Sequence, residues 1–263
     1  MIKLIAQDFN IYQGDDLHAG ARTGAISINH LLSAGAQGVI LGHSEINDSP
    51  EIINSKIKTI LNNEAIKKSP DNFSLAILVG ESWNEFEKNS NEQVANIIYN
   101  KCKIIFKDIP KDAVKNSIIG YEPKWGTRGS GRDDMPPPKP ELISACIKSL
   151  KKFMDDNYKN LKPFYVYGGS STPERTLEIL QDDNIDGLIL GSACNTLEKT
   201  INIISSMKKI KGSKDKVAIC NFKAYILPDP YEEYIKELKK LSGDFFVYLA
   251  PAYTDLRLVK QLL

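Results

Sequence analysis

Three side chains suited to acid–base chemistry lie at the ends of short apolar runs. His43, Glu122 and Lys223 each stand within two residues of the end of such a run. A carboxylate can remove a proton from a carbon next to a carbonyl group, while an imidazole polarises the carbonyl and an ammonium group stabilises the enediolate that forms. If the fold brings these side chains together, the sequence holds the groups needed for proton transfer beside a carbonyl.

Small residues follow other apolar runs and could bind an anion. Gly168-Gly169-Ser170 and Gly191-Ser192 form such turns, and backbone N–H groups at glycine turns and helix N-termini bind phosphate. Each feature alone is weak evidence. A histidine is more often structural than catalytic, a glutamate at a strand end can be an ion-pair partner, and Gly-Gly-Ser can be a plain turn.

The elements that would position these groups alternate regularly. Short continuous runs rich in Ile, Val and Leu are typical of parallel strands buried on both faces. Between them, apolar residues recur at steps of three and four, as in Leu142–Met154 and Tyr231–Leu241, which indicates amphipathic helices. We expect strands near Lys3–Gln7, Gly38–Gly42, Ser74–Gly80, Ser117–Glu122, Phe164–Gly168, Gly187–Gly191, Val217–Asn221 and Phe245–Ala250.

About eight strands alternating with about eight helices predict an α/β fold with a parallel sheet. Composition alone cannot separate a closed (β/α)₈ barrel from an open doubly wound sheet. In both, loops at the carboxyl ends of the strands carry the functional site. The best candidate for a linker is Lys208–Lys216, but only a quarter of a domain follows it. We therefore expect one domain over residues 1–263.

Composition excludes several classes of partner. The chain has 34 basic and 33 acidic residues, which gives no electrostatic reason to expect nucleic acid or an anionic membrane. The beginning of the chain lacks the apolar core of a signal peptide, and no apolar run is long enough to span a bilayer. The spacing of Asp15, Asp16 and His18 matches no firm metal-ligand pattern. We expect a cytoplasmic protein whose four cysteines, at positions 102, 146, 194 and 220, are buried free thiols.

Several segments together resemble the triosephosphate isomerase family, and the likeness covers essentially the whole chain. The most specific are the HSE, YEPxW and YGGS motifs, which occur in register. The resemblance implies a TIM barrel that needs no metal or organic cofactor. The segments are VILGHSE (Val39–Glu45), LVGE (Leu78–Glu81), GYEPKWG (Gly120–Gly126), YGGSSTPE (Tyr167–Glu174), IDGLILGSA (Ile185–Ala193) and CNFKAY (Cys220–Tyr225).

The order of these segments differs from that of the family. Members open with a strand carrying Asn-x-Lys and then a strand ending in Ala-Pro. Here those two units are KVAICNFKAY and FFVYLAPAY, and they come last. The chain therefore resembles a circularly permuted member, with the third to eighth strands of the family first and the first two strands last. Both changes fall in connections at the bottom of a barrel, away from the catalytic face.

The resemblance assigns roles to individual residues. Glu122 would be the base that moves a proton between two substrate carbons, and His43 the neutral electrophile. Lys223 would supply positive charge, with Asn221 orienting it and Glu45 as a nearby carboxylate. This pairing of a glutamate base with a neutral histidine is the known mechanism of the family, not a deduction from this sequence. The implied reaction interconverts glyceraldehyde 3-phosphate and dihydroxyacetone phosphate.

The resemblance also implies a phosphate site and a lid. The phosphate of a small triose substrate would contact Gly129, Ser170, Gly191 and Ser192, and the segment from Pro123 to about Gly131 would close over it. The lid is one residue longer than the usual pattern, Lys124 replaces a usual valine, and Ser192 replaces a usual glycine.

Further departures concern the homodimer that the resemblance implies. Ala25 and Ile46 stand where members usually have a glutamate and an arginine that pair across the subunits, and Asp8 replaces an asparagine. We still expect a homodimer, in which Thr23 supports Lys223 of the other subunit.

The sequence allows two other functions and argues against a third. One is an isomerase of another short phosphosugar, such as a tetrulose phosphate, and a second is an inactive barrel that serves as a binding protein. A doubly wound nucleotide-binding domain would show a GxGxxG turn after a strand, and none of the predicted strand ends has one.

Overall fold

The computed structural model describes residues 1–11, 23–127, 135–210, 216–241 and 245–263. Its strands form one eight-stranded sheet in the order β1-β8-β7-β6-β5-β4-β3-β2, with parallel pairing throughout. The predicted strands are confirmed to within two or three residues. They are β1 (Ile2–Leu4), β2 (Gly38–Leu41), β3 (Ser74–Val79), β4 (Ile118–Tyr121), β5 (Phe164–Gly168), β6 (Gly187–Leu190), β7 (Lys216–Asn221) and β8 (Phe245–Ala250).

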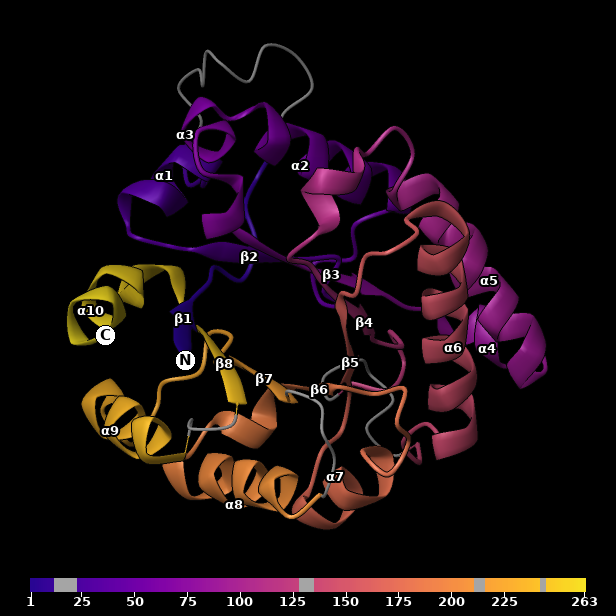
Figure 1. The fold of residues 1–263 in the computed structure, drawn as a ribbon. Coiled ribbons are helices and arrows are strands. Elements are labelled where there is room, and N and C mark those ends of the chain that lie inside the picture. The colour runs from indigo at the N-terminus through magenta and orange to yellow at the C-terminus, as the bar shows by residue number, and fades with distance from the viewer. Residues whose placement is uncertain (12–22, 128–134, 211–215, 242–244) are drawn as a thin grey trace.

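Backbone hydrogen bonds between the first two strands complete the barrel. The N–H of Ala6 donates to the carbonyl of Gly38, and the N–H of Ile40 donates to the carbonyl of Ala6, each at 2.9 Å. On its other side β1 pairs with β8. The strands therefore form a ring surrounded by helices (Figure 1), and of the two architectures left open by composition the structure has the (β/α)₈ barrel.

Helices cover the outside of this ring. The N-terminus of α7 shows a typical cap: Thr172 Oγ1 accepts a hydrogen bond from the N–H of Arg175, and Pro173 occupies the first helical position. The α-helices are α1 (Ile28–Ser33), α2 (Pro50–Asn62), α3 (Glu64–Lys67), α4 (Trp83–Phe86), α5 (Asn91–Ile105), α6 (Pro140–Asn157), α7 (Pro173–Ile179), α8 (Leu197–Lys208), α9 (Tyr231–Leu241) and α10 (Leu256–Leu262). Short 3₁₀ turns are η1 (Pro70–Asn72), η2 (Lys111–Val114), η3 (Ser192–Cys194) and η5 (Tyr253–Asp255).

The core has two layers because each strand buries both faces. Alternate strand residues point into the barrel, where Ile40, Leu78, Val166 and Ile219 belong to one apolar cluster. The other strand residues face the helices and form a larger cluster with their apolar stripes. The predicted free cysteines are confirmed, and all four are buried in this structure.

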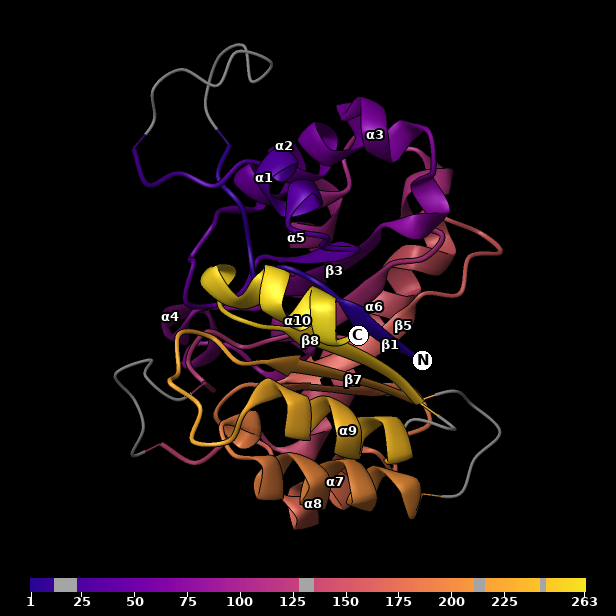
Figure 2. The ribbon, with the colours of Figure 1, turned by 90° about the vertical axis from the view of Figure 1, so that its left-hand side faces the viewer.

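The two ends of the chain lie near each other at one side of the barrel in both views (Figures 1 and 2). The amino group of Met1 donates to the carbonyl of Phe245 at the start of β8. In a parallel barrel all carboxyl ends meet on the opposite face, so the side chains that follow the strands are gathered there. Among the described residues no helix is long and apolar enough to cross a membrane.

Candidate active site

His43 is positioned by the sharp turn that ends β2. Gly42 has φ of +78°, and a Cβ at this position would lie 2.3 Å from the carbonyl oxygen of Leu78, so only glycine fits. The imidazole is 5% exposed, and its Nδ1 accepts a hydrogen bond of 3.2 Å from the backbone N–H of Glu45. Because Nδ1 is an acceptor, a neutral ring carries its proton on Nε2, which faces the barrel mouth.

Glu122 follows β4 and approaches the same imidazole. Its Oε1 lies 3.5 Å from His43 Nε2, and its Oε2 accepts a hydrogen bond of 2.7 Å from the N–H of Ser44. The side chain is 4% exposed. A Cβ on Gly80 would lie only 1.7 Å from the carbonyl oxygen of Glu122, so the close approach of the ends of β3 and β4 requires a glycine.

Lys223 reaches the site from a left-handed turn after β7. Its φ is +51°, and its N–H donates to Asn221 Oδ1 at 3.0 Å. The carbonyl of Lys223 accepts from Gln7 Nε2 at 2.8 Å, which ties this turn to the end of β1. The ammonium group forms an ion pair with Glu45. Lys223 is therefore held by residues that lie more than 170 positions away in the sequence.

One pocket brings most of the predicted site residues together. Of the catalytic and phosphate-binding residues expected from the sequence, His43, Glu122, Ser170, Gly191, Ser192 and Lys223 line it. Asn221 and Glu45 do not line the pocket but contact Lys223. Gly129 lies outside the described residues, and Thr23 is an exposed residue elsewhere on the surface. The pocket is also lined by Gly169 of the expected anion-binding turn and by Thr127 of the predicted lid. Ser171, Ile189 and Ala193 line it as well, and the sequence gave these three residues no role.

The small residues expected to bind phosphate form one side of this pocket. Ser170 follows β5, and Arg175 on α7 donates from Nε to its carbonyl at 3.0 Å. The same guanidinium donates from Nη2 to the carbonyl of Pro138. Gly191 follows β6, and a Cβ there would lie 3.0 Å from Lys223 Cε. No feature of the sequence signalled the role of Arg175, because its partners are known only from the fold.

The described part of the predicted lid, residues 123–127, is anchored to a buried carboxylate. Trp125 Nε1 donates to Glu81 Oε1 at 2.7 Å, and the Tyr121 hydroxyl donates to the same oxygen at 3.0 Å. Burial raises the pKa of Glu81 above its ordinary value. The unusual Lys124 donates to Asn47 Oδ1 beside the histidine loop. The remainder of the predicted lid, to Gly131, is outside the described residues.

One departure from the family pattern, Asp8, forms a buried ion pair in the structure. The Lys56 ammonium is almost fully buried and lies 2.7 Å from Asp8 Oδ1 and 2.6 Å from Asp48 Oδ2. Burial raises the pKa of Asp8, and the hydrogen bond from Lys56 opposes this shift. Asp8, which replaces the usual asparagine, is thus compensated by a buried cation. Asp15, Asp16 and His18 lie outside the described residues, and the described residues hold no cluster of three or more metal-ligating side chains.

The pocket combines a carboxylate, an imidazole and an ammonium group beside a wall of glycine and serine residues. Such a set can move a proton at a carbon next to a carbonyl group while the charge that develops on oxygen is stabilised. Serine hydroxyls and the backbone of a glycine turn suit a phosphate group on the same small molecule.

Comparisons with known proteins agree with this chemistry. The model of the family described as triosephosphate isomerase matches residues 1–207. The triosephosphate isomerase of Alkaliphilus oremlandii is 33% identical over 210 residues, which cover 78% of this chain and 77% of the relative. The proteins of the same name from Malacoplasma penetrans and Mycoplasmoides gallisepticum are 29% and 30% identical, over 77% of this chain and 76% and 75% of theirs. The chain belongs to the triosephosphate isomerase family.

Proposed function

We propose that Glu122, His43 and Lys223 perform the isomerisation of triose phosphates in this chain. The reaction itself, the interconversion of D-glyceraldehyde 3-phosphate and dihydroxyacetone phosphate, follows from family membership. The single observation that carries the assignment of residues is their convergence: Glu122 Oε1 lies 3.5 Å from His43 Nε2, and both side chains line one pocket with Lys223.

In this mechanism Glu122 takes a proton from the carbon next to the substrate carbonyl. The electrons of that C–H bond form the C=C bond of an enediolate, and the carbonyl electrons move to oxygen. His43 donates a hydrogen bond from Nε2–H to this oxygen, since its Nδ1 is occupied by the N–H of Glu45. His43 then gives its Nε2 proton to this oxygen and takes the proton of the neighbouring hydroxyl group, so the negative charge moves to the second oxygen. Glu122 returns its proton to the former carbonyl carbon while the second oxygen forms the new carbonyl group, which completes the exchange of aldehyde and ketone. The Lys223 ammonium stabilises the negative charge.

The substrate phosphate would lie between the turn at Ser170 and the turn at Gly191-Ser192. This placement puts it on the side of the pocket opposite the imidazole loop and beside Lys223. The backbone N–H groups of the two turns provide donors for the phosphate oxygens. Ser192, in place of the usual glycine, adds a hydroxyl group to this wall.

A coupled assay of the purified chain tests the proposal against its two rivals. Triose phosphates and tetrulose phosphates are compared as substrates under identical conditions. We expect turnover of the trioses with the higher kcat/KM. Turnover of tetruloses alone would instead indicate an isomerase of another phosphosugar, and no turnover of either would indicate a barrel that serves only in binding.

We also propose that the chain is a circularly permuted member of the family, folded as one barrel domain over residues 1–263. The family model stops at residue 207, before β7 and β8. These last strands nevertheless pair with β6 and β1 and supply Asn221 and Lys223. The sequence after the segment 208–216 therefore has the motifs of the first two family strands and fills their place in the ring.

We further propose a cytoplasmic homodimer. Ile226 is 99% exposed, and Ile46 and Tyr253 are 45% and 40% exposed. Tyr253 borders one surface pocket with Ile46 and another with Ile226, so these apolar side chains form a continuous patch. Patches of this kind on a water-facing surface mark protein interfaces.

Light scattering after size-exclusion chromatography tests the dimer. We expect the mass of two chains, and a shift toward the monomer for Ile226→Asp. The matched control is Ile104→Asp, at an apolar residue that is 39% exposed on α5 and outside the patch. A monomer in the unmodified protein, or equal effects of the two substitutions, would contradict the proposal.

A further inference from the structure

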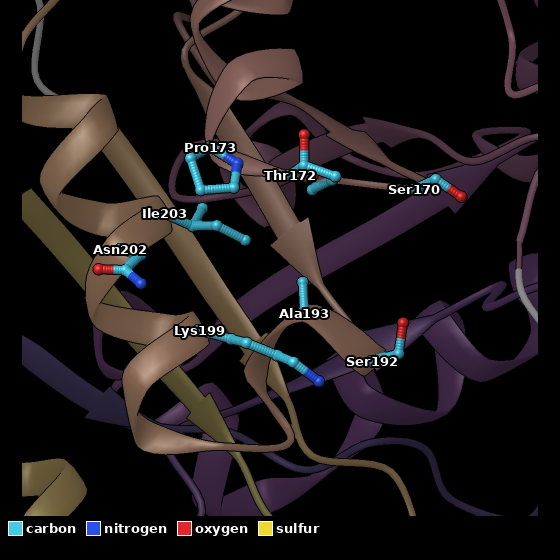
Figure 3. Close-up of a pocket in the computed structure, with 9 residues that line it drawn as sticks. Ser170, Thr172, Pro173, Ser192, Ala193, Lys199, Asn202 and Ile203 are labelled. Carbon is cyan, nitrogen blue, oxygen red and sulfur yellow. The ribbon is translucent and has the colours of Figure 1, made fainter.

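A second pocket lies behind the phosphate-binding turns, between α7 and α8 (Figure 3). Its volume is about 270 Å³, which is near the lower end of the range for small-ligand pockets. It shares Ser170, Ser171, Ser192 and Ala193 with the catalytic pocket. The two cavities are therefore neighbours across a single thin wall that consists of the turns proposed to hold the substrate phosphate.

The walls of this second pocket are suited to a small anion. The Lys199 side chain extends from α8 toward Ser192 (Figure 3), and its ammonium group donates to Asn195 Oδ1 at 3.2 Å. None of the nine described residues that line the pocket is acidic. The floor is apolar and is formed by Pro173, Ala193 and Ile203.

The two pockets differ in the charged side chains that surround them. In the catalytic pocket the Lys223 ammonium is paired with Glu45, and Glu122 is a second carboxylate nearby. The Lys199 ammonium, in contrast, donates to the amide oxygen of Asn195. An anionic group that passes the wall at Ser170 and Ser192 would thus meet a cation with no competing carboxylate on the lining.

We propose that this pocket is a subsite for the second phosphoryl group of a diphosphate-class ligand. The inference rests on the proposed function, since the first phosphoryl group occupies the substrate phosphate position. The second group extends past Ser192 into the space beside Lys199. Such a ligand competes with the triose phosphate, so molecules carrying two linked phosphoryl groups inhibit the enzyme more strongly than those carrying one.

Inhibition by inorganic phosphates of increasing length tests the subsite. Orthophosphate, pyrophosphate and tripolyphosphate are compared as competitors of the triose substrate, in buffer free of divalent cations. We expect pyrophosphate or tripolyphosphate to bind at least about tenfold more tightly than orthophosphate, and Lys199→Met to abolish most of this gain. Orthophosphate binding and the kcat for trioses should change less than twofold in the variant, because Lys199 does not line the catalytic pocket.

The matched control is Lys209→Met, which removes the same charge from an exposed position just after α8. This variant should bind pyrophosphate more tightly than orthophosphate, as the unmodified protein does. Equal weakening of pyrophosphate binding in both variants would indicate a general effect of lost positive charge and would overturn the proposal. No gain for either longer phosphate in the unmodified protein would overturn it as well. Calorimetric titration with pyrophosphate keeps the test independent of turnover, so loss of the subsite is distinguished from an inactive enzyme.

Discussion

At the scale of single residues, one short loop holds both members of the proposed acid–base pair. The consecutive N–H groups of Ser44 and Glu45 donate to Glu122 Oε2 and to His43 Nδ1. The first fixes the carboxylate beside the imidazole, and the second determines which ring nitrogen carries the proton. Backbone donors cannot rotate away or titrate, so this arrangement fixes the orientation of the imidazole and leaves Nε2 directed at the pocket.

Replacement of the proposed base tests this arrangement directly. Glu122→Gln keeps an oxygen for the Ser44 N–H but removes the proton acceptor, so kcat should fall by about 10²–10⁴-fold. Steady-state kinetics of both reaction directions measure the loss, and urea unfolding measures stability.

The matched control is Glu92→Gln, at an exposed residue in the first turn of α5. It should leave kcat unchanged. If Glu122→Gln turned over normally but unfolded at much lower urea, Glu122 would be a structural residue and another group would be the base.

Glu81 makes a prediction about pH. Burial raises the pKa of Glu81 in the folded protein above the ordinary value of 4.5. At a pH between 4.5 and the pKa of the folded protein, the folded state therefore holds a proton that the unfolded chain has lost. The folded state then binds more protons, and the free energy of unfolding falls as the pH rises through that window. Glu81→Gln removes this pH dependence of the free energy of unfolding and keeps an oxygen that accepts hydrogen bonds from Trp125 and Tyr121.

Urea unfolding of the two proteins between pH 4.5 and 8 measures the effect. Relative to Glu81→Gln, the unmodified protein should lose stability as the pH rises above 4.5, and the difference should level off once the pH exceeds the pKa in the folded state. Parallel stability curves would show that Glu81 titrates alike in the folded and unfolded chains.

At the scale of elements, Arg175 connects three parts of the phosphate side. It lies on α7 and donates to the carbonyl of Ser170 in the turn after β5 and to that of Pro138 before α6. A planar guanidinium can serve both carbonyls at once, which a lysine cannot do in the same geometry. The turn at Ser170 is therefore fixed by a helix that follows it in sequence.

Loss of this connection should weaken substrate binding more than chemistry. Hydrogen bonds from a charged donor contribute about 1.5–3 kcal/mol, so Arg175→Ala should raise KM by roughly tenfold while kcat changes little. Arg175→Lys should recover only part of the loss. Steady-state kinetics decide the matter: a fall in kcat with KM unchanged would show that Arg175 acts on the catalytic side of the pocket instead.

At the scale of the whole molecule, the barrel depends on strands from both ends of the chain. β8 pairs with β1, and Gln7 after β1 contacts the backbone carbonyls of Lys223 and Ala250. Residues 1–207, the part matched by the family model, lack β7 and β8 and would leave two open strand edges. The proposed site needs Lys223 as well, so the final quarter is required for both fold and activity.

A rearranged chain tests how far the order of segments matters. In this variant the chain begins with residues 216–263, and a short glycine-rich linker joins residue 263 to residue 1. The connection between α8 and β7 is opened, so the new ends of the chain lie there. The original ends lie near each other (Figures 1 and 2), so the barrel and its catalytic face should form unchanged.

We expect kcat within about threefold of the unmodified value, because β7 begins at the face of the barrel away from the site. Circular dichroism and the coupled assay measure folding and turnover, and residues 1–207 alone serve as the inactive control. A rearranged chain that folds but has lost most of its activity would show that the connection after α8 contributes to the site.

The sequence by itself determined the strands and indicated the residues of the proposed site. Strands buried on both faces appear as continuous apolar runs, so their positions follow from local pattern, and all eight lie within two or three residues of the expected bounds. His43, Glu122 and Lys223 were recognisable because motifs of the family surround them.

Only the tertiary structure decided closure of the ring and the contacts that hold the site. The pairing of Ala6 with Val39, the bond from the Ser44 N–H to Glu122 and the two bonds of Arg175 all join segments that are distant in sequence. Local patterns specify which face of an element is apolar but contain no distance between one element and another. Such distances arise when the packed ring places each strand end beside its neighbours.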